Sequence, residues 1–83
     1  MSLENTIGKL LNSGNPTAEK IAQKIKNIND ALAAKDITAD EAKNLLNDMD
    51  VATHLAELAD ELEVKILVQQ AVDALTSIIG LLI

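Results

Sequence analysis

The chain has 83 residues and a net charge of -6, with no cysteine, no aromatic residue and no arginine. This length suits one domain, residues 1–83, and the lack of cysteine excludes disulfides and the usual sulfur-based zinc sites within it. Without aromatic rings or guanidinium groups, the chain lacks the side chains that stack on bases or grip guanine and phosphate, so we expect no nucleic-acid partner.

Two helices are predicted in the first part of the chain. The first covers residues 3–12 and has Ser2 as its cap. Asn15 followed by Pro16 is typical of a helix cap and the first helical position, because proline has no N–H to leave unpaired there. The second predicted helix covers residues 16–34 and carries aliphatic residues at spacings of three and four, which indicate one buried side.

The third predicted helix begins after a capping box. Thr38 and Glu41 have the spacing at which each side chain can bond the other's backbone N–H, so this helix covers residues 39–49. The apolar side chains that follow residue 49 point about 130° away from those of this helix, which predicts that a new helix begins there. We favour a continuous last helix over 51–79, about 43 Å long. The direction of the apolar side chains changes again near residue 63, so a break there is the alternative.

These segments predict an all-α protein, a small helical bundle of four to five helices. On folding, a chain this short buries only about three-fifths of the surface that its unfolded form exposes. The predicted last helix is also apolar on two opposed sides. We therefore expect a homo-oligomer in which a second copy covers one of those sides. The predicted self-association face consists of five aliphatic residues of this helix: Val68, Leu75, Ile78, Ile79 and Leu82.

The negative charge is concentrated in one segment. Residues 48–63 hold six acidic residues and no lysine, whereas the rest of the chain is balanced. Such a segment is either the solvated side of a helix or a docking surface for a basic protein. The predicted acidic docking face consists of Asp60, Glu61 and Glu63.

His54 is the single histidine, and three acidic residues share its predicted side of the helix: Asp50, Glu57 and Glu61. Oxygen ligands with one imidazole suit a divalent cation, but structural zinc sites need further strong ligands from converging elements. We therefore predict no metal site. No nucleophile motif surrounds the serines and no glycine-rich phosphate loop is present, so we expect no catalytic residue, no cofactor and no enzymatic activity.

The last 20 residues, 64–83, match the length of a membrane span. Lys65, Gln69, Gln70 and Asp73 gather on one side of this segment, and a buried acid is costly in a bilayer. We therefore expect a soluble helix. The start of the chain lacks the basic and apolar regions of a signal peptide, which predicts a cytoplasmic protein.

Together these features predict a non-enzymatic interaction or assembly protein that self-associates through its apolar last helix. The first alternative is a monomeric acidic adaptor or inhibitor of a basic protein. The second alternative is a membrane-docked helical protein. Lysine without arginine is also typical of bacterial or phage accessory proteins from AT-rich genomes.

Overall fold

Residues 3–58 and 60–82 are described by a computed structural model of the protein. The described residues form helices and no strand, so the prediction of a small all-α bundle with four to five helices is confirmed. The predicted cap Ser2 lies outside the described residues. The helices are α1 (Leu3–Leu11), α2 (Pro16–Ala33), α3 (Ala39–Asp48), α4 (Val51–Glu57) and α5 (Leu62–Leu82).

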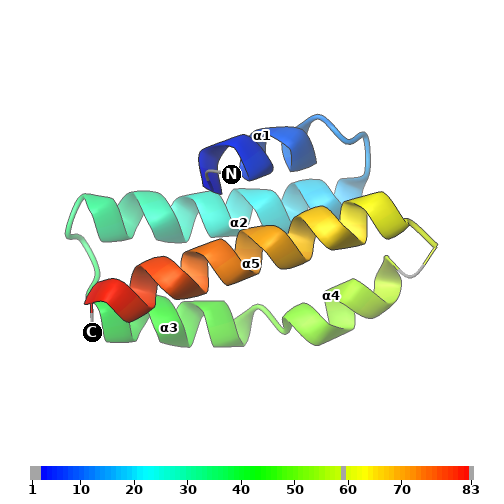
Figure 1. The fold of residues 1–83 in the computed structure, drawn as a ribbon. Coiled ribbons are helices and arrows are strands. Elements are labelled where there is room, and N and C mark those ends of the chain that lie inside the picture. Colours follow the sequence, from blue (N-terminus) through cyan, green and yellow to red (C-terminus); the bar gives the residue numbers. More distant parts are fainter. Residues whose placement is uncertain (1–2, 59, 83) are drawn as a thin grey trace.

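Two helices, α2 and α5, form the centre of the bundle (Figure 1). They run in the same direction and contact each other, and α1 packs against both of them. Helix α3 also contacts both α2 and α5, and α4 continues along the line of α3 toward the turn that leads into α5. Helix α5 therefore packs against α1, α2 and α3.

The beginnings of α2 and α3 follow from local hydrogen bonds. The Ala18 N–H donates to Asn15 Oδ1 over 3.1 Å, and Pro16 occupies the first turn of α2. At α3, the Glu41 N–H donates to Thr38 Oγ1 and the Thr38 N–H donates to Glu41 Oε1, both over 3.1 Å. These bonds satisfy N–H groups that the first helical turn leaves unpaired, and both predicted caps are confirmed.

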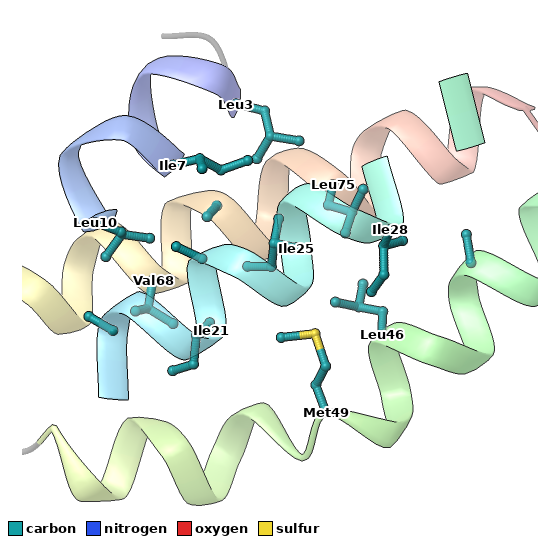
Figure 2. Close-up of a cluster of buried hydrophobic side chains, with 14 of the residues drawn as sticks. Leu3, Ile7, Leu10, Ile21, Ile25, Ile28, Leu46, Met49, Val68 and Leu75 are labelled. Atoms are coloured by element: carbon teal, nitrogen blue, oxygen red, sulfur yellow. The ribbon is translucent and has the colours of Figure 1, made fainter. Parts of the chain in front are cut away.

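Among the described residues, the buried side chains are aliphatic apart from those of Met49 and Thr6. Figure 2 shows side chains from α1, α2, α3 and α5 gathered in one interior. The radius of gyration of 12.1 Å agrees with the value of about 12 Å expected for a compact chain of this length. The largest fully buried aliphatic side chains are Leu10, Ile21, Ile25, Leu58, Val68 and Leu75.

The favoured continuous helix over 51–79 does not form, and the chain breaks instead, as the alternative had it. Helix α4 ends at Glu57, and in the turn the Glu61 N–H donates to the Leu58 carbonyl over 2.9 Å. In one straight helix Leu58 and Val64 would point about 120° apart. Because of the turn, both are buried in the same core. The bundle is 35 Å in its longest dimension, shorter than the predicted helix alone.

Helix α4 is attached mainly at its two ends. None of its own residues is buried, whereas Met49 before it and Leu58 after it are. Asp50 occupies the cap position in the left-handed region, with φ 51°. Its carboxylate accepts a hydrogen bond from Thr53 Oγ1 over 2.7 Å and caps no backbone N–H.

The end of α2 forms a Schellman motif with a lysine at the left-handed position. The Asp36 N–H donates to the Ala31 carbonyl over 2.9 Å, and the Lys35 N–H donates to the Leu32 carbonyl over 3.1 Å. Lys35 has φ 62°, a conformation that glycine adopts without strain. This side chain therefore costs stability at this position.

Lys35→Gly is expected to stabilise the fold by about 0.5–1 kcal/mol, the relief of left-handed strain less the extra entropy of glycine in the unfolded chain. For a domain of this size the Tm should rise by about 2–8 °C, measured by circular dichroism. The matched control is Lys20→Gly in the second turn of α2, which should lower the Tm. An unchanged or lower Tm for Lys35→Gly would contradict this account of the motif.

Candidate interaction surface

The structure divides the predicted self-association face between the core and the surface. Val68, Leu75 and Ile79 are buried against the chain's own helices, and Ile78 is half-buried beside them. Only Leu82 is exposed. The predicted contact set therefore needs correction, because α1, α2 and α3 cover the side of α5 on which most of it lies.

The large apolar side chains that remain exposed lie mainly on α5. They are Leu45 of α3 and four residues of α5: Leu62, Ile66, Leu81 and Leu82. Leu62 and Ile66 are one helical turn apart, so they point in nearly the same direction, away from the core. We call this pair the α5 ridge. Leu81 and Leu82 are consecutive and point about 100° apart, so they do not form one continuous surface.

The α5 ridge is more exposed than its composition would lead one to expect of a core helix. Leu62 is 67% exposed and Ile66 is 49% exposed. By length and composition alone, helix α5 could cross a membrane, because a stretch of 18 of its residues has a mean hydropathy of 1.4. Only 22% of that stretch is buried in the bundle. Nine apolar residues of α5 are buried in the core or packed against it, so its uncovered large apolar side chains are those of Leu62, Ile66, Leu81 and Leu82.

The predicted acidic docking face is on the surface next to this ridge. Asp60 and Glu61 lie in the turn before α5, Glu63 lies in its first turn, and all three are exposed. Among the described residues, no lysine comes within ion-pair distance of these three carboxylates. The favourable spacing of Glu61 and Lys65 therefore does not produce an ion pair, and the acidic face is open to solvent.

A groove lies between α2 and α3, on a part of the molecule that sequence reasoning did not single out. Its volume is about 350 Å³, and it lies mostly between apolar side chains. Leu45, which is 44% exposed, forms part of its lining. We call this hollow the α2–α3 groove. Its lining residues are Lys24, Asn27, Ile28, Ala31, Leu45, Asp48 and Met49.

One sequence signal could have pointed to the groove. On the helical wheel of α3, Leu45 lies at the edge of the stripe formed by the buried residues Ala42 and Leu46. A large aliphatic residue in that position widens the apolar side beyond what one neighbouring helix covers. The groove itself also requires the spacing of α2 from α3, which no local pattern specifies.

The surroundings of His54 do not form a metal site. Its Nδ1 is buried and lacks a hydrogen-bond partner, and Glu57 Oε2 lies 3.7 Å away. The Asp50 carboxylate accepts a hydrogen bond from the Thr53 hydroxyl. Glu61 is not on the same helix as His54, because it lies in the turn between α4 and α5. No group of three or more potential ligands that could hold a metal ion occurs in the described part of the chain.

Comparisons of the chain with models of protein families, with curated protein sequences and with solved structures found no match. Three features of the molecular surface remain as indications of function: the α5 ridge, the acidic residues beside it and the α2–α3 groove.

Proposed function

We propose that this protein is a non-enzymatic helical assembly protein that associates with copies of itself through the α5 ridge. The observation that carries the proposal is that the first two turns of α5 expose two large aliphatic side chains on the side away from the core. One side packs into the core, whereas Leu62 and Ile66 on the other side remain exposed. The bundle covers one side of α5 and leaves this exposed pair without a partner, which a second copy would supply.

The size of the ridge sets the strength expected of this association. Leu62 and Ile66 are already partly buried, so covering their remaining surface is worth about 2–3 kcal/mol. Association costs about 4–15 kcal/mol in lost freedom of movement, so the ridge needs further contacts to hold two copies together. We therefore expect an assembly that depends on protein concentration, with additional apolar surface contributed by the second copy.

The solution mass tests this proposal. Light scattering after size exclusion, over a hundredfold range of concentration, should give a mass above the monomer's 8.9 kDa at the upper end. Because the chain has no tryptophan or tyrosine, refractive index is the suitable concentration signal. Leu62→Asp should return the mass to that of the monomer, since a charge in the contact must lose its hydration.

Leu81→Asp is the matched control, because Leu81 is 87% exposed and lies outside the ridge. It should leave the mass unchanged. A wild-type chain that stays monomeric at every concentration would overturn the proposal. If that monomer bound a polylysine peptide in a salt-sensitive manner, the acidic face with Asp60, Glu61 and Glu63 would instead mark an adaptor for a basic protein.

A further inference from the structure

The α2–α3 groove has walls of opposite charge on either side of its apolar lining. Lys24 projects from α2 and Asp48 from α3, and both side chains are exposed. In the described structure neither residue forms an ion pair, with the other or with a third residue. Both charges are therefore available to a ligand that lies along the groove.

The α5 ridge carries the matching pattern of charges. Glu63 follows Leu62 by one residue and lies about 100° around the helix on one flank, while Lys65 lies about 60° away on the other flank. Glu63 is exposed and Lys65 is half-buried. The ridge is thus an apolar strip between a negative and a positive side chain. One of the two directions along the groove places Glu63 on the side of Lys24 and Lys65 on the side of Asp48.

We propose that the α5 ridge of one copy docks into the α2–α3 groove of the next copy. This inference rests on the self-association proposed above and names the second surface of the contact. Leu62 and Ile66 would fill the space lined by Leu45 and Met49, and the flanking charges would fix the direction in which the ridge lies. The groove supplies the additional apolar surface that the ridge alone lacks.

The ridge and the groove have no residue in common, so this contact joins two different surfaces of the same chain. A contact of that kind leaves a free ridge on one end copy and a free groove on the other, which leads to a closed ring or an open chain of copies. Two ridges meeting about a twofold axis would instead form a closed dimer. Leu45 and the rest of the groove would then stay exposed to water.

Mixing two variants distinguishes these arrangements. Leu62→Asp blocks the ridge and leaves the groove intact, whereas Leu45→Asp blocks the groove and leaves the ridge intact. Each variant alone should be monomeric, and the equimolar mixture should form a dimer of twice 8.9 kDa that grows no further. Both leucines are surface residues, so far-UV circular dichroism should show the wild-type fold in each variant.

Charge reversal provides a second measurement, which also serves if Leu45→Asp fails to fold. Lys24→Glu and Glu63→Lys should each lower the mass, and the chain that carries both changes should recover it. Wild-type assembly without a dimer in the mixture, or Leu45→Asp assembling like the wild type, would overturn this inference and leave the self-association standing. A monomeric wild-type chain would overturn both.

Discussion

Leu75→Asp is expected to abolish cooperative unfolding, because the altered chain should not fold. Leu75 is fully buried, with 0% of its surface exposed, in the middle of α5. Removing such a leucine side chain to alanine costs about 2–5 kcal/mol, and a buried unpaired carboxylate adds a further penalty. A chain of 83 residues has a total stability of about 4–12 kcal/mol. The substitution therefore consumes most or all of that stability.

Thermal unfolding followed by circular dichroism at 222 nm measures this effect. The control is the same substitution at an exposed position of the same helix, Leu81→Asp, which should keep its transition near that of the wild type. A milder variant, Leu75→Ala, should fold with a lowered Tm. If Leu75→Asp instead folded normally and differed from the wild type only in a lower mass in solution, Leu75 would be a contact between copies and the core would be wrongly assigned.

Leu58→Ala is expected to release α4 while the rest of the bundle stays folded. Leu58 is 1% exposed, and α4 itself contains no buried residue, so this side chain is the main attachment at its C-terminal end. The loss of the buried side chain costs about 2–5 kcal/mol. Because an isolated helix of seven residues is not stable in water, a detached α4 should unfold locally.

Amide hydrogen exchange resolves this effect by region. The amides of α4, such as that of His54, which donates to the Asp50 carbonyl, should exchange faster in Leu58→Ala than in the wild type. The amides of α2 should keep their protection. The control is Leu55→Ala, because Leu55 is only half-buried and its loss should change the exchange of α4 less. Equal losses of protection in α2 and α4 would show that α4 unfolds only with the whole bundle.

The helix starts were predictable because they depend on neighbouring residues. Asn15 and Pro16 begin α2, and Thr38 with Glu41 begins α3, through hydrogen bonds that span only three residues. The turn at residues 58–61 was harder to predict, since no glycine or proline marks it. Its position depends on Leu58 and Val64 sharing one core, which is a tertiary requirement.

The candidate surface was predictable only in part. The apolar stripe of α5 correctly indicated that Val68, Leu75 and Ile79 need to be covered. A stripe does not reveal whether the covering residues belong to the same chain or to another copy, because both exclude water equally well. The chain itself covers these three residues. The exposed pair Leu62 and Ile66 emerged only once the positions of α1, α2 and α3 around α5 were known.

The order of the helices has a consequence for the synthesis of this protein on the ribosome. Helix α5 contacts α1, α2 and α3, yet it follows all of them in the sequence. Until α5 leaves the exit tunnel, the earlier helices lack the surface on which their aliphatic side chains pack, and short helices alone are marginal in water. The helices that precede α5 therefore expose apolar side chains to chaperones and to other nascent chains until α5 has emerged.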